Sequence, residues 1–312
     1  MKNNNGKTKS ASSIIAEPTQ QFGGDWTEVK LDLLKKYLEA YTTALKNQPF
    51  GKIYIDAFAG TGYREMEAKE NSPGLFVEQS EAESEGFFDG SAKLALQIPN
   101  PFEKYIFVEK SQKNIEELRR VISSEFPTLL RRVEFEPGDA NQVIPEICRK
   151  TDWRTNRAVL FLDPFGMSVD WQTMESIART EAIDVWILFP VSVNRLLIGN
   201  LENIPQKWQD SLTRVFGTSE WRNIFYKKKI EATLFGDEQK IVKVPDPISA
   251  VVQFYQEQLR KIFKKVSNNP RFLCNSKNSP MFIFAFAIGN PKPAAQKLAI
   301  KIAEYILGKV KT

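Results

Sequence analysis

Apolar residues recur along this chain with two spacings, and the two spacings alternate. Helical spacing marks residues 27–45, 91–98, 111–124, 142–149, 171–179, 248–263 and 294–307. Short apolar runs typical of buried strands fall at residues 52–56, 105–108, 133–135, 158–163, 184–189 and 282–288. Strands and helices that take turns in this way are typical of a doubly wound sheet. The pattern therefore predicts an α/β fold with a mostly parallel sheet.

Three stretches depart from this alternation. Residues 1–20 are polar and poor in bulky apolar side chains, so we expect a flexible tail before a domain that spans residues 21–312. Residues 63–89 are acidic and rich in Ser, Gly and Glu, which favours an insertion or lid. Residues from about 192 to 246 contain several amphipathic pieces with Trp208 and Trp221 and predict a helical insertion. If the chain docks a partner, either residues 63–89 or this region, with its two tryptophans exposed, would form the docking surface.

The amino-acid composition limits the location and the kinds of catalytic or metal site that we expect. A chain of 312 residues with 42% hydrophobic content can bury a full core. No apolar run is long enough to cross a membrane, and the polar start lacks a signal peptide, so we expect a cytoplasmic protein. Histidine is absent and the two cysteines form no CxxC pair, which argues against a metal site. Any catalysis would use Asp, Glu, Lys, Tyr or a cofactor.

The net charge of +5 favours anionic partners, nucleic acid among them. Basic clusters lie at residues 131–132, 227–229 and 261–265, and Phe225, Tyr226, Phe263 and Phe272 are interleaved with them. The alternatives are that the cations lie on solvated helix faces and that the rings belong to the core.

A glycine-rich turn follows the first predicted strand, in the sequence Asp-Ala-Phe-Ala-Gly-Thr-Gly from Asp56 to Gly62. Glycine lets a ligand approach the backbone closely, so Asp56, Phe58, Gly60 and Gly62 are candidate cofactor-binding residues. The dinucleotide pattern needs a third small residue where Glu65 stands, which disfavours a nicotinamide cofactor. A structural turn is the alternative for the loop.

Two more acidic residues follow predicted strands. Glu109 ends the second strand, where a carboxylate can accept hydrogen bonds from both ribose hydroxyls of a nucleoside. Asp139 follows the third strand, where it could accept from an adenine amino group or, alternatively, cap a helix. Together with the loop, these positions predict an S-adenosylmethionine site.

The fourth predicted strand ends in Asp163-Pro164-Phe165-Gly166. Ligands bind at this edge of a doubly wound sheet, so Asp163, Pro164 and Phe165 are candidate catalytic residues. The carboxylate could orient an amine while the proline and the ring form a rigid slot, and methyl transfer depends chiefly on such alignment. A structural aspartate in a tight turn is the alternative.

Several of these blocks together resemble the three-Cys-motif partner proteins over residues 22–310. The blocks are Trp26-Thr27, residues 30–37, residues 54–60, Asp89-Gly90-Ser91, residues 161–166, residues 184–190 and residues 194–197. The resemblance implies a class I methyltransferase-like (Rossmann-like) fold, a bacterial or phage-like cytoplasmic setting and a radical-SAM-like iron–sulfur partner that bears three cysteines.

Two functions remain open at this point. The chain is either a methyltransferase that uses S-adenosylmethionine on a nucleic-acid or amine substrate, or a docking protein for the three-Cys-motif partner. The Asp163-Pro164-Phe165 block is similar to the Asp-Pro-Pro-aromatic motif of amino-group methyltransferases but lacks one proline. The sequence specifies neither the substrate nor the oligomeric state.

Overall fold

The structure is a computed structural model that describes residues 25–60, 90–164, 166–233, 236–275 and 277–309. The expected tail at 1–20 and the expected insertion at 63–89 lie outside the described residues. The same holds for Gly62 and Phe165. Within the described part, no helix is long and apolar enough to cross a membrane.

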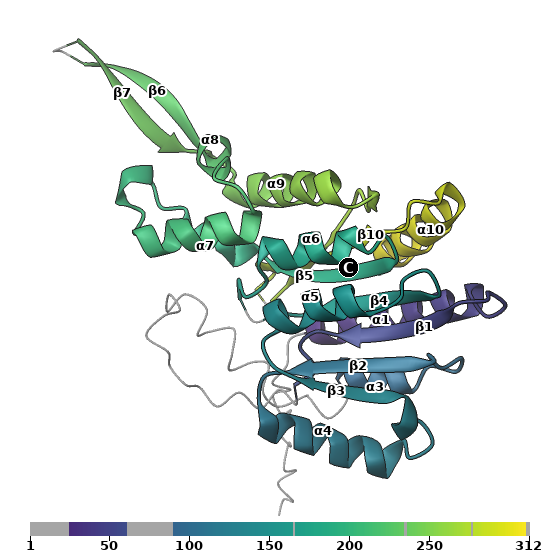
Figure 1. Ribbon diagram of the computed structural model, residues 1–312. Coiled ribbons are helices and arrows are strands. Elements are labelled where there is room, and N and C mark those ends of the chain that lie inside the picture. The colour runs from purple at the N-terminus through teal and green to yellow at the C-terminus, as the bar shows by residue number, and fades with distance from the viewer. Residues whose placement is uncertain (1–24, 61–89, 165, 234–235, 276, 310–312) are drawn as a thin grey trace, which may run out of the picture.

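A single mixed sheet forms the centre of the protein (Figure 1). Its strands lie in the order β3-β2-β1-β4-β5-β10-β8, and β9 also pairs with β10. The strands β1 to β5 run parallel to one another, whereas β10 is antiparallel to β5, β8 and β9. The bounds are β1 Gly51–Asp56, β2 Lys104–Glu109, β3 Val133–Pro137, β4 Asn156–Leu162, β5 Ile183–Pro190, β8 Lys265–Val266, β9 Arg271–Cys274 and β10 Pro280–Ile288. The expected doubly wound, mostly parallel sheet of class I methyltransferase type is confirmed.

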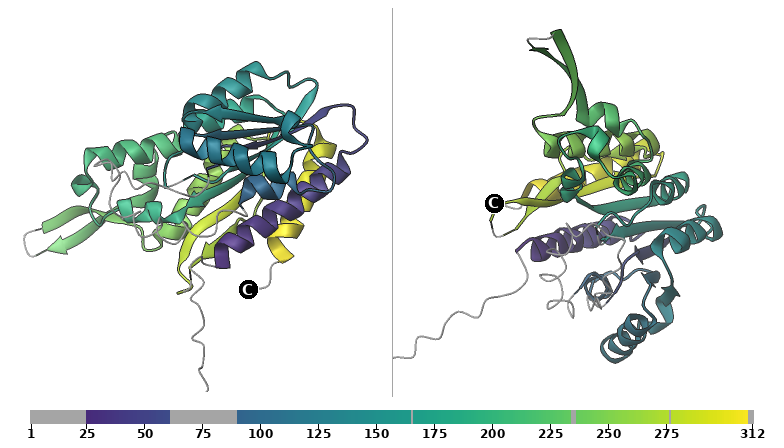
Figure 2. Two further views of the ribbon diagram at one scale, coloured as in Figure 1. Left: turned by 90° about the horizontal axis from the view of Figure 1, so that it is seen from below. Right: turned by 90° about the vertical axis from the view of Figure 1, so that its left-hand side faces the viewer.

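Helices cover both faces of this sheet (Figure 2). One face carries α1 (Asp25–Ala44), α3 (Ser91–Leu96), α4 (Gln112–Glu125) and α10 (Pro293–Lys309), and the other carries α5 (Ala140–Lys150), α6 (Trp171–Arg179) and α9 (Pro247–Ile262). Successive strand residues serve opposite faces: Ile53 and Ile55 join one apolar cluster, and Tyr54 joins the other. This explains why the strands read as continuous apolar runs instead of an alternation.

The segment after β5 differs from the expected helical insertion at 192–246. It begins with 3-10 turns and the helices α7 (Gln206–Phe216) and α8 (Trp221–Phe225), but a hairpin of β6 (Tyr226–Thr233) and β7 (Gly236–Lys243) follows. The hairpin projects from the body of the protein (Figures 1 and 2). β-branched and aromatic residues in β6, with a glycine at the start of β7, favour a hairpin over a helix.

The aromatic residues of this region are mostly buried. Trp221 is 0% exposed, so the expectation that it forms an exposed docking residue is wrong. Its indole Nε1 donates to Thr213 at 3.0 Å, and its ring packs with α7 in the apolar cluster. Phe225, Tyr226 and Phe263 are also buried, as the core alternative predicted, whereas Phe272 is 40% exposed.

Candidate functional site

The candidate residues lie at the carboxyl ends of the parallel strands. Asp56 and Glu109 are the last residues of β1 and β2, Asp163 follows β4 directly, and Asp139 follows β3 after one residue. The register of the sheet brings these strand ends to one edge, the edge at which doubly wound folds bind ligands.

Asp56 is fully buried and organises the loop that follows it. Its Oδ1 accepts a hydrogen bond from the Phe58 backbone N–H at 3.2 Å. Its Oδ2 accepts from the Ser91 hydroxyl at 2.5 Å and from the Tyr54 hydroxyl at 3.3 Å. Burial raises the pKa of Asp56 to about 6 against these hydrogen bonds, and the negative charge of Asp163 adds a smaller upward contribution. Asp56 is therefore placed to position the loop backbone, and its part in cofactor binding remains a prediction.

The raised pKa of Asp56 predicts a pH dependence of stability. A carboxyl that titrates near pH 4 when unfolded and near pH 6 when folded holds its proton more tightly in the folded state. Its contribution to stability is therefore complete below pH 4 and is lost as the pH rises through 6. Between pH 4.5 and pH 7.5, the free energy of unfolding of the wild type should fall by on the order of 2 kcal/mol more than that of Asp56→Asn, as measured by urea unfolding. Parallel curves for the two proteins would contradict the assignment.

Gly60 and Glu109 lie against each other. A Cβ atom on Gly60 would overlap Glu109 Oε2, so this contact needs glycine. The Ala59 backbone N–H donates to the Val108 carbonyl at 2.9 Å and ties the loop to the end of β2. The Ser111 backbone N–H donates to Glu109 Oε1 at 2.7 Å, whereas Oε2 has no hydrogen-bond partner among the described residues. The expected loop and the expected ribose-binding carboxylate are thus neighbours.

Asp139 caps the helix α5. Its Oδ1 accepts from the Asn141 backbone N–H at 2.9 Å, which is the helix-cap alternative raised by the sequence. Its Oδ2 lies 3.5 Å from Lys110 Nζ. Gly138, with φ of 148°, forms the turn before it and donates to the Glu109 carbonyl at 3.0 Å. Asp139 therefore lies beside the end of β2, and its contact with an adenine remains a prediction.

Asp163 forms an ion pair that the sequence did not reveal. Its Oδ2 lies 2.6 Å from Lys30 Nζ, and Lys30 is only 7% exposed. The Lys30 ammonium also lies 4.8 Å from the centroid of the Trp26 ring. Pro164 is buried next to this pair, and Gly166 adopts a left-handed φ of 59°. Helix α1 thus contributes a cation to the candidate catalytic position.

The sequence feature that could have revealed Lys30 as a site residue is its position in the helical repeat of buried residues. It lies four residues after Trp26 and four before Leu34, so it shares the buried face of α1 with them.

Asn141 is a second residue near the site that the sequence analysis did not identify. Its side chain donates to the Ser168 carbonyl at 2.6 Å and accepts from the Asp170 backbone N–H at 2.9 Å, which holds the segment after Gly166 against α5.

Comparison with known proteins gives similarity in structure only. No family model and no curated protein matches the chain, so the three-Cys-motif partner family remains a prediction. A Legionella pneumophila protein of the family DUF519 is 14% identical with a TM-score of 0.44, over 91% of this chain and 93% of that one. An O-methyltransferase from Bacillus cereus in complex with SAH is 13% identical with a TM-score of 0.38, over 88% and 93%.

The spermidine synthase of Thermotoga maritima is also similar, at 10% identity and a TM-score of 0.40, and this chain covers 63% of its length. At such TM-scores the structural overlap between this chain and these proteins is partial. The assignment of the fold rests on the order and direction of the strands.

Proposed function

We propose that this protein binds S-adenosylmethionine at the carboxyl edge of the sheet and transfers its methyl group to an amine or nucleic-acid substrate in the cytoplasm. The observation that carries the proposal is the contact between Gly60 and Glu109. A nucleoside can approach the loop backbone there because Gly60 has no Cβ atom, and Glu109 Oε2, which has no hydrogen-bond partner within the described residues, offers an acceptor for ribose hydroxyls.

Each residue then has a role that its position supports. Asp56 holds the start of the loop through Phe58 and Ser91, and we expect Phe58, Gly60 and Gly62 to bind the methionine part. Asp139 Oδ1 is used by the helix cap and Oδ2 lies 3.5 Å from Lys110 Nζ, so an adenine amino group would share Oδ2 with this exposed lysine. The bound cofactor would supply an electrophilic methyl group, and the protein would supply alignment of the substrate with it.

Asp163 and Lys30 would face the substrate. Lys30 provides the counter-charge of the Asp163 carboxylate at Oδ2, and Oδ1 has no hydrogen-bond partner in the described chain. An amino group of the substrate could donate to this oxygen and be oriented by it. Pro164 would limit the movement of the turn, and Phe165 would stack on the substrate.

The basic surface supports nucleic acid as the substrate class. Lys227 and Lys228 are exposed on the projecting hairpin, and Arg131, Arg132, Lys261, Lys264 and Lys265 are also exposed. Exposed cations bind phosphates, and a two-stranded ribbon has the width to enter a major groove.

Binding of S-adenosylhomocysteine tests the proposal directly. We expect saturable binding by calorimetry in the micromolar range, and we expect Glu109→Ala to weaken it at least about tenfold, or about 1.4 kcal/mol, because charge-assisted hydrogen bonds to the ribose are lost. Glu116→Ala is the matched control, since Glu116 is exposed on α4. Equal affinity of wild type and Glu109→Ala would remove Glu109 from the site.

Absence of binding in a folded sample would favour the second candidate, a docking protein for a three-Cys-motif, radical-SAM-like iron–sulfur protein. The ion pair between Asp163 and Lys30 supports this alternative because it occupies one oxygen of the carboxylate expected at the substrate. In that case the chain should co-purify with the three-Cys-motif protein.

A further inference from the structure

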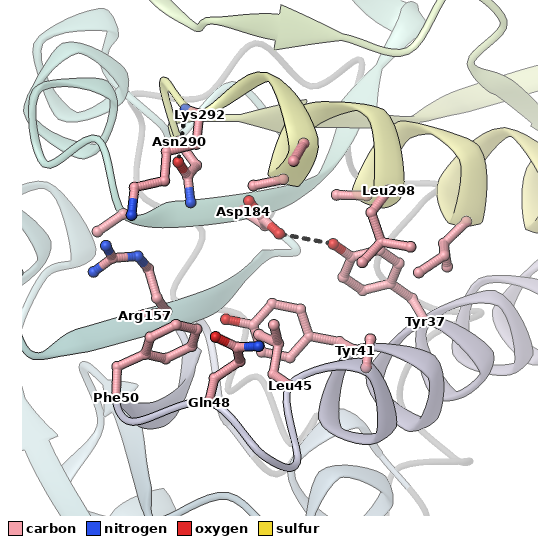
Figure 3. A pocket seen from close by; sticks show the side chains of 16 residues that line it. Tyr37, Tyr41, Leu45, Gln48, Phe50, Arg157, Asp184, Asn290, Lys292 and Leu298 are labelled. Carbon is pink, nitrogen blue, oxygen red and sulfur yellow. Dashed lines mark hydrogen bonds between the residues drawn. The ribbon is translucent and has the colours of Figure 1, made fainter.

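A cavity lies at the opposite edge of the sheet from the candidate cofactor site. It has a volume of about 300 Å³, at the small end of the range for ligand pockets (Figure 3). Arg157 and Asp184, the second residues of β4 and β5, line it. Asp56 lies at the other end of β1, which pairs with β4 over six residues, so the two sites are roughly 16–20 Å apart.

Most of the cavity wall is apolar. The rings of Tyr37 and Tyr41 from α1 form one side, and the first turns of α10 form the other through Ala294, Ala295 and Leu298. The alanines leave the space that larger side chains would fill. Leu298 lines this wall and is 45% exposed. The cavity therefore offers a place for a compact apolar group.

Two polar groups inside the cavity are buried but have unused hydrogen-bonding capacity. Asp184 is 8% exposed, and its Oδ2 accepts from the Tyr37 hydroxyl at 2.8 Å, but its Oδ1 has no partner among the described residues. The Tyr41 hydroxyl, in a residue that is 6% exposed, also has no hydrogen-bond partner in the described chain. Both atoms border the cavity and neither is among the fully buried unpaired side-chain atoms of the described residues, so a ligand that enters the cavity can reach them and pair with them.

Positive charge gathers at the same cavity. Arg157 uses Nη1 for the carbonyls of Trp153 and Asn156, both at 2.6 Å, and its guanidinium lies over the Phe50 ring at 5.2 Å from the centroid. Its other nitrogens make no hydrogen bond within the described residues. Lys292 lines the cavity just before α10, whose N-terminal end carries a partial positive charge. In Figure 3, Arg157 and Lys292 lie on one side, Leu298 and Tyr37 on the other, and Asp184 between them.

We propose that this cavity is a second binding site, specific for a small carboxylate with a compact apolar body. The carboxylate contacts Arg157 and Lys292, and the apolar body lies between the tyrosines of α1 and the alanines of α10. The Tyr41 hydroxyl donates to the carboxylate. This site is independent of the methyl-transfer proposal, because it uses none of the same residues.

The raised pKa of Asp184 is compatible with an anionic ligand beside it. Burial raises the pKa of Asp184 to about 7, while the Tyr37 hydrogen bond and the charge of Arg157 oppose the increase. The titratable and charged groups that line the cavity with Asp184 are Tyr37 and Tyr41 from α1, Arg157 from β4 and Lys292 before α10 (Figure 3). A protonated Asp184 can donate a hydrogen bond to a ligand carboxylate, whereas an ionised one repels it.

Three probes that share a phenylethyl body test the charge of the ligand: 3-phenylpropionate, 2-phenylethylamine and L-phenylalanine. Calorimetry on the full chain at pH 7 should show binding of the propionate, at least tenfold weaker binding of the amine and intermediate binding of the zwitterion. Ala295→Phe, which fills the cavity, should weaken binding of the propionate at least tenfold. Lys292→Ala should weaken it about threefold to fivefold, as expected for a charge near the surface.

Lys297→Ala is the matched control, because Lys297 is exposed on α10 and does not line the cavity. S-adenosylhomocysteine should not displace the propionate. If the protein does not bind S-adenosylhomocysteine, the proposed function fails, but the propionate should still bind because the two sites share no residues. The proposal is overturned if the amine binds best, if no probe binds saturably at millimolar concentration, or if Ala295→Phe and Lys292→Ala both bind the propionate like wild type.

Discussion

Gly217→Ala should lower the free energy of unfolding by about 2–4 kcal/mol. Gly217 ends α7 with a left-handed φ of 71°, which costs an L-residue about 1–2 kcal/mol. A Cβ atom there would also overlap the indole ring of Trp171, which is 7% exposed and packs edge-on against Tyr255 with 6.3 Å between ring centroids. Such overpacking costs about 1–3 kcal/mol, because a close-packed ring has nowhere to move. Urea unfolding at neutral pH measures the loss.

Gly199→Ala is the control for this substitution. No atom lies within 4 Å of the position that its Cβ would take, so the change in unfolding free energy should stay within about 0.5 kcal/mol. A similar small effect for Gly217→Ala would mean that α7 does not dock on Trp171 as described. The docking matters for the site, because Arg214 of α7 lies 3.1 Å from Asp170, the residue that precedes α6.

The sequence predicted the sheet well because its strands are buried on both faces. The run Ala158 to Leu162 serves both apolar clusters in turn, so every residue in it is apolar and the strand is visible without its partners. Helix α6 was predicted with its observed bounds, Trp171–Arg179, because its apolar residues recur at helical spacing.

The elements that the sequence missed have no such signal. Strand β8 has two residues and exists only through its pairing with Ala287 and Ile288 of β10. Two residues show no periodicity, so only the tertiary partner defines the strand. The sequence analysis interpreted the hairpin of β6 and β7 as helical, because its lysines and scattered apolar residues fit the period of a helix as well as that of a strand. Only the cross-strand pairing decides between the two.

The candidate site was predictable in its positions but not in its pairings. Acidic residues at strand ends marked Asp56, Glu109 and Asp163, since strand ends can be read from the apolar runs. The partner of Asp163 could not be read, because Lys30 is 133 residues away and only the packing of α1 on the sheet brings it close. The hydrogen bond from Ser91 of α3 to Asp56 could not be read either, because the two residues are 35 positions apart in the chain.

Gly60→Ala should weaken the binding of S-adenosylhomocysteine by roughly 10- to 150-fold, or about 1.5–3 kcal/mol, while leaving stability nearly unchanged. The added Cβ overlaps only the end of the Glu109 side chain, which is flexible and can move aside. The protein would then fold normally but present Glu109 in the wrong place, and a hydrogen bond to a charged group contributes about 1.5–3 kcal/mol. Calorimetry measures the affinity, and urea unfolding measures the stability.

The double substitution Gly60→Ala with Glu109→Ala separates two explanations for that loss. If the methyl group acts by displacing Glu109, the double variant should bind about as well as Glu109→Ala alone, because the displaced group is already gone. If instead the methyl group blocks the ligand itself, the two losses should add. Wild-type affinity in Gly60→Ala would contradict both, and it would place any bound nucleoside away from the end of β2.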